Sequence, residues 1–269
     1  MNMTQRLSDR VAIVTGAGRG FGRAIAEHFA AEGASLALVS RSDDQLNAVA
    51  AAITSRGGRA LALPGDVTLR TDVERIVRTA SERLGPVSLL VNNAGVPGPF
   101  GPIGSVDPAE WWASQQVHQL APLLFASAVI PGMRARGGGR IINISAKAGV
   151  VVAPNMSAYC VGKAAQIRLT EHIDAEGKAD GIRAFALQPG MVVTALAEQT
   201  AASPEAQKWL PGMTSRINAL RGTEEGTRDL AVCAETCVKL ASGRYDAIAG
   251  RYLDIVFDLD AMLRETSAQ

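Results

Sequence analysis

Tyr159 and Lys163 are the pair of side chains whose types and spacing most directly indicate chemistry. They stand four residues apart in a helical pattern over 157–178, so both project from one face of that helix. A tyrosine has an ordinary pKa of about 10 and is a poor acid–base catalyst near neutral pH. A neighbouring ammonium favours the phenolate and lowers this pKa. The pair therefore predicts a proton-exchanging group, although an exposed pair on an amphipathic helix would have the same spacing.

A glycine-rich turn, Thr15–Gly22, lies between an apolar run and a second helical pattern. Strand, glycine turn and helix in this order are typical of a dinucleotide-binding unit, whereas a glycine-rich turn alone is a weak signal. Gly16 permits a tight turn, and Gly20 and Gly22 let the backbone approach a pyrophosphate and the helix approach the sheet. The free N–H groups at the start of the helix would then face the phosphates.

The end of the second apolar run bears on which dinucleotide binds. An acidic residue there would hold the ribose 2′-hydroxyl and repel a 2′-phosphate. This chain has Ser40 and Arg41 instead, and Arg19 in the glycine turn could act with Arg41, because guanidinium groups suit phosphate oxygens. We therefore expect NADP(H), with NAD(H) as the alternative. The acidic pair that follows, Asp43-Asp44, is expected in the first turn of a helix.

These motifs lie in a regular alternation of apolar runs and longer helical patterns. Strands are expected at Val11–Thr15, Ser35–Ser40, Ala60–Pro64, Leu89–Asn92, Arg140–Ser145, Ile182–Gln188 and Tyr252–Ile255. Helices are expected near 20–32, 43–57, 70–84, 107–135, 157–178 and 223–241. Continuous apolar strands separated by helices indicate a parallel sheet covered on both faces. The expected fold class is therefore one α/β domain with a doubly wound parallel sheet of about seven strands.

Length and composition exclude several classes of protein. The chain has 269 residues, of which 47% are hydrophobic, and a net charge of +1. This charge argues against a basic surface for nucleic acid or for a membrane. No apolar run approaches the roughly 20 residues of a membrane span, and Met1–Arg10 lacks a signal-peptide core. We therefore expect a cytoplasmic protein.

The three cysteines show no disulfide framework, which agrees with a reducing compartment. Cys233 and Cys237 stand four residues apart on an expected helix and could face one ligand. Because no histidine or further cysteine is placed beside them, packing inside the helix is the favoured interpretation. We expect no metal site.

The motifs, in this order, resemble those of the classical short-chain dehydrogenase/reductase family from about Arg10 to Asp254. They are Thr15–Gly22, Asp66-Val67, Asn92-Asn93-Ala94-Gly95, Tyr159-Cys160-Val161-Gly162-Lys163, and Pro189-Gly190 with Thr194. One such motif would be a weak signal, but five at compatible spacing are specific. The resemblance implies a Rossmann fold over residues 1–269 that binds a nicotinamide cofactor.

The resemblance also implies roles for individual residues. Asp66 would bond the adenine amino group, Asn93–Gly95 would border the cofactor, and Val192 and Thr194 would approach the carboxamide of the nicotinamide. Lys163 would hold the nicotinamide ribose. The residues expected to contact the cofactor are Gly16, Arg19, Gly20, Phe21, Gly22, Ser40, Arg41, Asp66, Val67, Asn93, Ala94, Gly95, Tyr159, Lys163, Pro189, Gly190, Val192 and Thr194.

Two positions depart from the family pattern. A catalytic serine usually stands thirteen residues before the tyrosine, and here that position is Ala146. Ser145 is one residue earlier, and because side chains alternate along a strand it should point away from Tyr159. The family usually has asparagine in its proton relay where this chain has His118, which can also bind water and titrate near neutrality. A neutral substitution on a helix is the alternative interpretation of His118.

The segment after Pro189-Gly190 and the end of the chain complete the expected architecture. In the family, residues 191–223 would form a lid over the substrate, and its apolar members indicate an apolar or aromatic carbonyl compound, although an interface patch would look similar. These apolar members are Trp209, Leu210, Pro211 and Met213. A C-terminal extension over about 256–269 is expected to form a short helix, Phe257–Glu265, against the body or a neighbouring subunit.

Together these features predict an NADP(H)-dependent carbonyl reductase or alcohol dehydrogenase with Tyr159 as its acid or base. Its partner would be a small carbonyl or alcohol substrate. Ala146 keeps two alternatives open: a non-redox isomerase or cyclase, and a catalytically weak nucleotide-binding regulatory protein. The family commonly forms dimers and tetramers through the helices near 107–135 and 157–178, so we expect a homotetramer or a homodimer.

Overall fold

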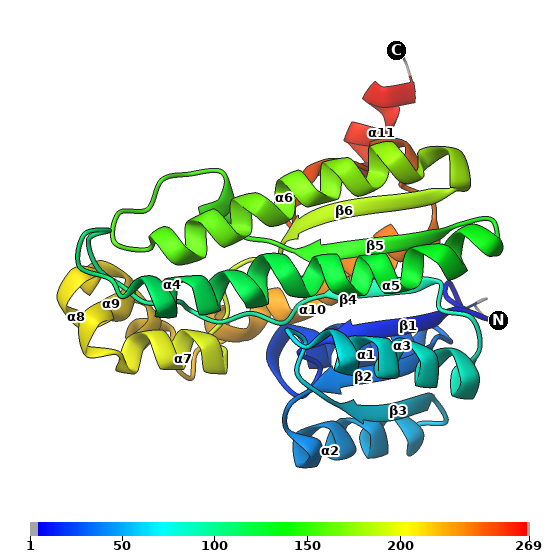
Figure 1. Cartoon of the computed structure of the whole chain (residues 1–269), viewed down its shortest axis with the longest axis horizontal. Coiled ribbons are helices and arrows are strands. Elements are labelled where there is room, and N and C mark those ends of the chain that lie inside the picture. The colour runs from blue at the N-terminus through cyan, green and yellow to red at the C-terminus, as the bar shows by residue number, and fades with distance from the viewer. Residues whose placement is uncertain (1–4, 268–269) are drawn as a thin grey trace.

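A parallel sheet of seven strands forms the centre of the computed structural model, which describes residues 5–267 (Figure 1). The strands are β1 (Val11–Thr15), β2 (Ser35–Ser40), β3 (Arg59–Pro64), β4 (Leu89–Asn92), β5 (Gly139–Ile144), β6 (Ile182–Gln188) and β7 (Tyr252–Asp254). Their order is β3-β2-β1-β4-β5-β6-β7, with parallel neighbours throughout. The predicted fold class is confirmed. Residues 1–4 and 268–269, at the ends of the predicted domain and C-terminal extension, lie outside the described range.

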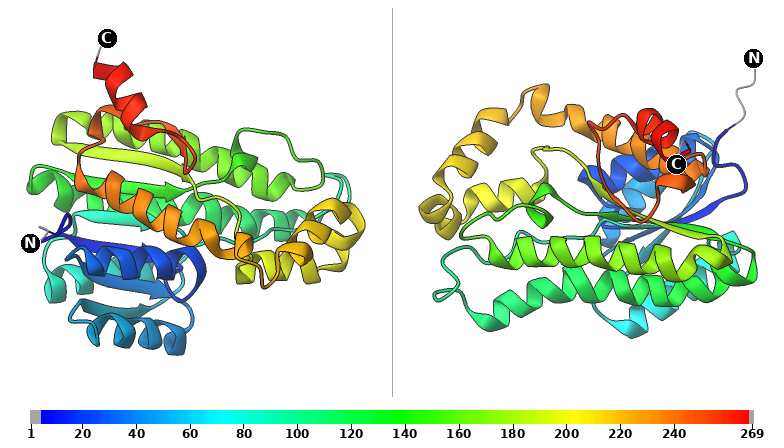
Figure 2. Two further views of the ribbon diagram at one scale, coloured as in Figure 1. Left: turned by 180° about the vertical axis from the view of Figure 1, so that it is seen from behind. Right: turned by 90° about the horizontal axis from the view of Figure 1, so that it is seen from above.

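Helices cover both faces of the sheet because its strands are apolar on both sides. One face packs on α1 (Gly20–Ala31), α2 (Asp43–Thr54) and α10 (Glu225–Ser242) through buried side chains such as Phe29, Leu46 and Cys237. The other packs on α3 (Arg70–Leu84), α5 (Ala121–Ala135) and α6 (Ser157–Gly177), through Ile76, Phe125 and Ile173. Figure 2 shows α5 and α6 on the side of the sheet opposite α10. The two cysteines of α10 are buried and unbridged, as the packing interpretation expects.

The strand order reverses between β1 and β4, which are neighbours in the sheet although two strands separate them in the chain. In open parallel sheets, ligands bind outside the carboxyl ends of the strands at such a switch point. Thr15–Gly22 follows β1 and Asn93–Gly95 follows β4. The fold therefore brings both motifs to one edge of the sheet.

The helix expected over 107–135 consists of three pieces. These are α4 (Pro108–Gln115), a π-helical turn at Gln116–Leu120, and α5. Asp107 caps α4 by accepting a hydrogen bond from the backbone N–H of Ala109 at 2.7 Å. A π turn inserts a residue into a helix without changing its apolar character, so the hydrophobic pattern alone does not predict it. Such turns are frequent at functional sites.

The segment expected to form a lid, residues 191–223, holds three helices that the sequence pattern did not predict. They are α7 (Ala195–Ala202), α8 (Pro204–Trp209) and α9 (Pro211–Leu220). Thr194 and Ser203 cap α7 and α8 by accepting hydrogen bonds from backbone N–H groups three residues on, at 3.4 and 3.2 Å. A capping residue followed by an apolar stretch is a readable start signal, but these helices are too short for clear periodicity.

The C-terminal helix α11 spans Leu259–Ser267 and so begins two residues later than expected. The reason is local: Asp258 accepts a hydrogen bond from the N–H of Ala261 at 2.9 Å, which places the cap one residue before Leu259. Met262 and Leu263 pack against the core that contains α10. Short 3-10 turns occupy Lys147–Gly149, Lys178–Asp180 and Asp246–Ile248. Among the described residues, we find no helix with the length and apolar character needed to cross a membrane.

Candidate active site

The glycine turn after β1 has the geometry that its glycines were expected to allow. Gly16 and Gly20 have φ angles of 65° and 56°, in the left-handed region that favours glycine. A Cβ at Gly22 would collide with the carbonyl oxygen of Gly16, so α1 packs directly on the turn. The described residues provide α1 with no side-chain cap and no acidic residue in its first turn. The N–H groups at its start are therefore available to an anion.

Partly buried hydrogen bonds tie this turn to the end of β4. Asn93 donates from Nδ2 to the carbonyl oxygen of Thr15 at 2.9 Å. The Thr15 hydroxyl accepts from the N–H groups of Asn93 and Ala94, at 2.9 and 3.1 Å. The carboxyl ends of β1 and β4 are thus joined, which places Asn93, Ala94 and Gly95 beside the glycine turn.

Ser40 lies at the end of β2, next to the glycine turn. Arg41 follows it in the chain, and Arg19 lies within the turn. A Cβ on Gly18 would lie 3.4 Å from Ser40 Oγ, so the glycine turn lies against the end of β2. Arg19 and Arg41 are both exposed, and neither forms an ion pair with another residue in the range 5–267. The acidic pair Asp43-Asp44 lies in the first turn of α2, as expected.

Asp66 and Val67 follow β3 at the same edge of the sheet. Asp66 Oδ1 accepts hydrogen bonds from the N–H and the hydroxyl of Thr68, at 2.8 and 2.7 Å. Asp66 N–H donates to Asp72 Oδ2 at 2.8 Å, and Val67 packs against the core beneath. These hydrogen bonds hold the Asp66 carboxylate in one orientation at the carboxyl edge of the sheet, where the glycine turn also lies.

The loop after β6 returns to the glycine turn. Gly190 has a φ of 85°, and the N–H of Met191 donates to Asp229 Oδ2 at 2.9 Å. A Cβ on Gly20 would lie 3.2 Å from Thr194 Cγ2. Pro189 and Val192 are buried in this loop. The expected nicotinamide and phosphate segments are therefore in direct contact.

The Lys163 ammonium lies inside the protein, with only 4% of the residue exposed. Its Nζ donates to the carbonyl oxygen of Ile144 at 2.7 Å and to Gln166 Oε1 at 3.0 Å. It lies 5.6 Å from the centroid of the Tyr159 ring. Burial disfavours the charged amine and lowers the pKa of Lys163 to about 7. The expected pair is therefore assembled, with the amine turned towards the end of β5.

The pKa of Tyr159 moves in the direction opposite to the one expected from a neighbouring ammonium. Burial of the phenol raises it to about 12, with a smaller contribution from Cys160. Lys163 does not offset this because its amine hydrogen-bonds elsewhere and is itself easily deprotonated. The phenol oxygen has no hydrogen-bond partner within the described part of the chain. With this pKa, the Tyr159 phenol is protonated at neutral pH and can donate a proton.

Ser145 does not replace the serine that is missing at position 146. Its side chain is 2% exposed, and its hydroxyl donates to the backbone carbonyl of Lys163 at 3.0 Å. Ala146 is extended, with φ −160° and ψ 157°, and starts the short turn that follows β5. The alternation of side chains thus leaves a methyl group where the family has a hydroxyl.

His118 lies in the π-helical turn and is fully buried. Its Nε2 lies 2.8 Å from the carbonyl oxygen of Val96, which can only accept, so the proton is assigned to Nε2. Its Nδ1 is then an acceptor, and it is buried without a partner among residues 5–267. The imidazole meets the Tyr159 ring edge to face, with centroids 5.4 Å apart at 89°.

The electrostatics of His118 correct the expectation that it titrates near neutrality. Burial, reinforced by the charge of Lys163, lowers its pKa to about 3, and the bond to Val96 offsets only part of this. An imidazole with this pKa is neutral at physiological pH. Its role is that of a fixed hydrogen-bonding group and a packing partner of Tyr159.

Two glycines make room for the imidazole, and sequence reasoning missed one of them. A Cβ on Gly162 would lie 2.7 Å from His118 Cβ and 3.0 Å from its Cγ, and one on Gly95 would lie 3.2 Å from Cε1. Gly162 stands inside α6, where glycine costs about 1 kcal/mol relative to alanine. A glycine inside a helical pattern commonly has a packing reason, and that signal could have been used here.

An apolar cluster closes the site on the side of the lid. Phe100, Met156 and Ala206 form its buried core, and the partly buried members are Ala153, Tyr159, Cys160, Leu210 and Met213. Asn155 Nδ2 donates to the carbonyl oxygen of Trp209 at 3.3 Å, which ties α8 to the loop before α6. The predicted lid residues therefore lie against the Tyr159 side of α6.

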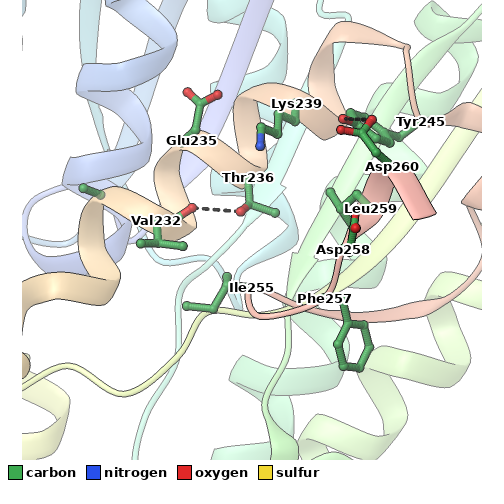
Figure 3. Close-up of a pocket in the computed structure, with 11 residues that line it drawn as sticks. Val232, Glu235, Thr236, Lys239, Tyr245, Ile255, Phe257, Asp258, Leu259 and Asp260 are labelled. Atoms are coloured by element: carbon green, nitrogen blue, oxygen red, sulfur yellow. Dashed lines mark hydrogen bonds between the residues drawn. The ribbon is translucent and has the colours of Figure 1, made fainter. Parts of the chain in front are cut away.

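A groove of about 500 Å³ lies elsewhere, between α10 and the segment leading into α11 (Figure 3). Several of its polar groups already have partners: Tyr245 donates to Asp260 at 3.0 Å, and Arg6 pairs with Glu235 at 2.6 Å. Tyr159 and Lys163 do not line it. The groove is therefore separate from the candidate chemistry.

The contact between Gly162 and His118 predicts an energetic coupling. Gly162→Ala should destabilise the protein by about 1–3 kcal/mol, because the new methyl group overpacks the imidazole. In a His118→Ala background the contacts with the ring are gone and only the contact with Cβ remains, so the same change should cost about 1 kcal/mol less. Urea denaturation of the four proteins measures this difference. Gly132→Ala, where a Cβ meets nothing within 4 Å, is the control, and additive costs would contradict the contact.

The low pKa of His118 predicts how stability depends on pH. Its pKa of about 3 in the folded protein lies below the ordinary histidine pKa of 6.5, so the unfolded chain binds an extra proton between these values. Stability should fall as the pH drops through this window, by up to about 1.4 kcal/mol per unit. His118→Asn should lose about 2 kcal/mol less than the original protein between pH 7 and pH 5. Urea denaturation at both pH values measures this, with the exposed His172→Asn as control; equal losses would refute it.

Comparison with known proteins agrees with this geometry. The family model for short chain dehydrogenases matches residues 10–205. A short chain dehydrogenase of Pseudocercospora fijiensis is 32% identical over 269 residues, covering 98% of this chain and 85% of its own. A gluconate 5-dehydrogenase from Burkholderia cenocepacia, in complex with NADP and tartrate, superposes with a TM-score of 0.80 at 28% identity, covering 96% and 98% of the two chains. A 7α-hydroxysteroid dehydrogenase complexed with NADH and 7-oxo glycochenodeoxycholic acid has a TM-score of 0.80 at 28% identity, covering 93% and 94%.

The matched residues include the glycine turn, the segment after β4 and the Tyr159–Lys163 pair. The chain belongs to the short-chain dehydrogenase/reductase family of oxidoreductases.

Proposed function

We propose that the protein is an NADP(H)-dependent carbonyl reductase or alcohol dehydrogenase that acts on a ketone and its secondary alcohol. The observation that carries the proposal is the placement of the Tyr159 phenol. It lies beside Lys163 at the carboxyl edge of the sheet, on the same edge as the uncapped start of α1. A proton donor and an anion site on one edge are what reduction of a carbonyl by a dinucleotide requires.

The residues fit a nicotinamide dinucleotide. The lack of a side chain at Gly22 lets α1 pack directly on the turn, and Gly16 takes a left-handed backbone conformation, so the N–H groups at the start of α1 face the region where a phosphate would bind. Asn93–Gly95 and Thr194 would border the nicotinamide end, and Lys163 the adjoining ribose. When bound, the cofactor supplies or accepts a hydride.

Tyr159 would give its proton to the substrate oxygen during reduction. Its raised pKa supports this direction, because the phenol is protonated at neutral pH and needs no prior proton uptake. The edge contact with His118 and the lid cluster hold the ring in place. The ring is partly buried, and its oxygen, which has no hydrogen-bond partner among residues 5–267, remains free to meet a substrate oxygen.

The preference for NADP(H) rests on residues of this chain. The structural relatives differ, since one is in complex with NADP and the other with NADH. Here β2 ends at Ser40 rather than at an acidic residue, and Arg19 and Arg41 are exposed on either side of it. Two guanidinium groups would favour a ribose 2′-phosphate.

The substrate class follows from the lid cluster. Phe100, Met156, Leu210 and Met213 belong to the same apolar cluster as Tyr159. An apolar surface of this kind binds apolar or aromatic ketones better than anionic ones. The substrate is therefore proposed to be a largely apolar or aromatic carbonyl compound.

Ala146 favours a second candidate function. The hydroxyl that would steady the developing alkoxide is absent, and Ser145 is engaged with Lys163. Losing one such donor costs about 10²–10³ in rate. A non-redox isomerisation or cyclisation on the same scaffold would need Tyr159 without that hydroxyl. A catalytically weak regulatory protein would need neither Tyr159 nor the missing hydroxyl.

We further propose a homodimer or homotetramer in the cytoplasm. Exposed apolar side chains on α4, α5 and α6 support an interface there, among them Trp112, Leu123 and Val161. The three free cysteines support a reducing compartment.

Oxidation of NADPH with a panel of ketones tests the function directly. Tyr159→Phe keeps the ring and its contact with His118 but removes the proton donor, so turnover should fall by about 10²–10⁴ while the Kd for NADPH changes little. Full turnover in the Phe variant would mean that another group transfers the proton. Product formation without a change in nicotinamide absorbance would favour the isomerase or cyclase.

Ala146→Ser separates a weakened reductase from an adapted one. A restored hydroxyl should raise turnover on simple ketones by up to about 10²-fold if the donor is merely missing. Turnover of a substrate that supplies its own hydrogen bond would not rise in this variant. Little change on simple ketones would therefore favour adaptation.

The cofactor preference has its own test. Arg41→Ala should weaken NADPH binding by about ten- to a hundredfold and NADH binding much less, because only the phosphate is contacted. Fluorescence titration of both cofactors measures this. Arg56→Ala is the matched control, since Arg56 is exposed just beyond the opposite end of α2. Tighter binding of NADH than of NADPH by the original protein would overturn the assignment.

A further inference from the structure

Gln166 is a buried polar residue that the sequence motifs do not account for. It stands three residues after Lys163 on α6 and has no exposed surface. Its Oε1 accepts a hydrogen bond from Lys163 Nζ at 3.0 Å. An ammonium only donates, so the amide oxygen, and not its nitrogen, must face the lysine. The orientation of the amide is therefore fixed by the chemistry of its partner.

A chain of hydrogen bonds holds α6 at Gln166 against the centre of the sheet. The backbone carbonyl of Gln166 accepts from the Thr170 hydroxyl at 2.8 Å, and that hydroxyl accepts from Asn143 Nδ2 at 2.8 Å. Asn143 Oδ1 accepts in turn from Asn92 Nδ2 at 2.8 Å. All of these groups are buried. The helix is therefore anchored to β5 and β4 one turn after Gln166, while the Gln166 Nε2 is buried without a hydrogen-bond partner among the described residues, so Lys163 is the only side-chain partner of this amide there.

We propose that Gln166 is a positioning residue for the active site, whose amide oxygen holds the Lys163 ammonium on the buried side of Tyr159 and keeps it protonated. The proposal deepens the proposed function, because it rests on Lys163 acting beside Tyr159. Two of the three donors of Nζ are used by Ile144 and Gln166. The third remains for a ribose or a water on the open side.

The surroundings of Lys163 leave this oxygen as its main side-chain support. Tyr159, on the same helix, is neutral at neutral pH, and His118, on the π-helical turn, is neutral as well. The charged groups on neighbouring elements lie away from Lys163: Glu110 and Lys147 are exposed, Arg140 and Arg183 lie near the starts of β5 and β6, and Lys178 and Asp180 follow the C-terminal end of α6. The carbonyl of Ile144 belongs to the backbone and is common to any sequence. The side chain at position 166 therefore determines how favourable the charged form of Lys163 is in this site.

The physical consequence is a balance of two effects on one amine. Burial opposes the charge on Lys163, and a hydrogen bond to the charged form favours it. Without the Gln166 oxygen the pKa of Lys163 should fall further below its present value of about 7. With a carboxylate in its place the pKa should rise. A residue that only filled space would produce neither shift.

An NMR titration of the cofactor-free protein tests this without relying on turnover. The chain has five lysines, so protein labelled with ¹³C at lysine Cε gives five signals, and Lys163→Arg assigns the one of interest. Gln166→Met keeps the length of the side chain and removes the acceptor; it should lower the Lys163 midpoint by about one to two pH units. Gln166→Glu keeps the acceptor and adds charge; it should raise the midpoint by at least about one unit.

Thr170→Val is the matched control, because it breaks the same buried chain at a residue that does not touch Lys163. Its midpoint should stay within a few tenths of a unit of the original. Circular dichroism confirms that each variant is folded, and either Gln166 variant alone suffices for the test. A Lys163 midpoint unchanged in a folded Gln166 variant, or shifted equally by Thr170→Val, would overturn the proposal. If the original protein does not turn over ketones, the proposed function is wrong, but the titration result still stands because it does not depend on turnover.

Discussion

The site depends first on the burial of one positive charge. An ammonium inside a protein is unfavourable unless hydrogen bonds replace the water it has lost. The chain supplies two acceptors for Lys163, the carbonyl at the end of β5 and the amide of Gln166. These bonds fix α6 against the carboxyl edge of the sheet. Tyr159 stands one turn earlier on the same helix, so the position of its phenol follows from the position of the amine.

The nucleotide half of the site is built on the same principle. Buried polar groups cannot be left unpaired, and here they are paired across strands rather than within them. Thr15 and Asn93 join β1 to β4 at the point where the strand order reverses. Thr194 then contacts Gly20 from the loop after β6. Both halves therefore meet along one edge, and the lid cluster covers the half that contains Tyr159.

Most of the fold was predictable because each strand is a continuous apolar run between glycine-rich or polar turns. The motifs also identified the glycine turn, Asn93 and the Tyr159–Lys163 pair, since these depend on local spacing. The π-helical turn, the short lid helices and the start of α11 were not predictable, because each depends on a single cap or an inserted residue rather than on periodicity.

The electrostatics of the site could not be read from the sequence either. A neighbouring ammonium was expected to lower the pKa of Tyr159, and burial raises it instead. His118 was expected to titrate near neutrality, and burial keeps it neutral. In both cases the sequence gives the identity of the charged neighbour but not the extent to which water is excluded. That extent depends on packing among α4, the π-helical turn and α6, and it outweighs the pairwise charge effect.

Ala146 and His118, the two departures from the family pattern, differ in whether neighbouring residues compensate for them. Ala146 is a simple loss, because nothing in its surroundings fills the role of the absent hydroxyl, and Ser145 is already engaged. His118 is a compensated change, because its ring occupies space that Gly162 and Gly95 leave free and its Nε2 has a partner in Val96. A site losing its function would accumulate substitutions without matching changes on the facing helix. Gly162 weakens α6 locally, and the imidazole that it admits packs against Tyr159. The imidazole at position 118 and the glycine at position 162 therefore fit one another, and their contact keeps the Tyr159 ring in place.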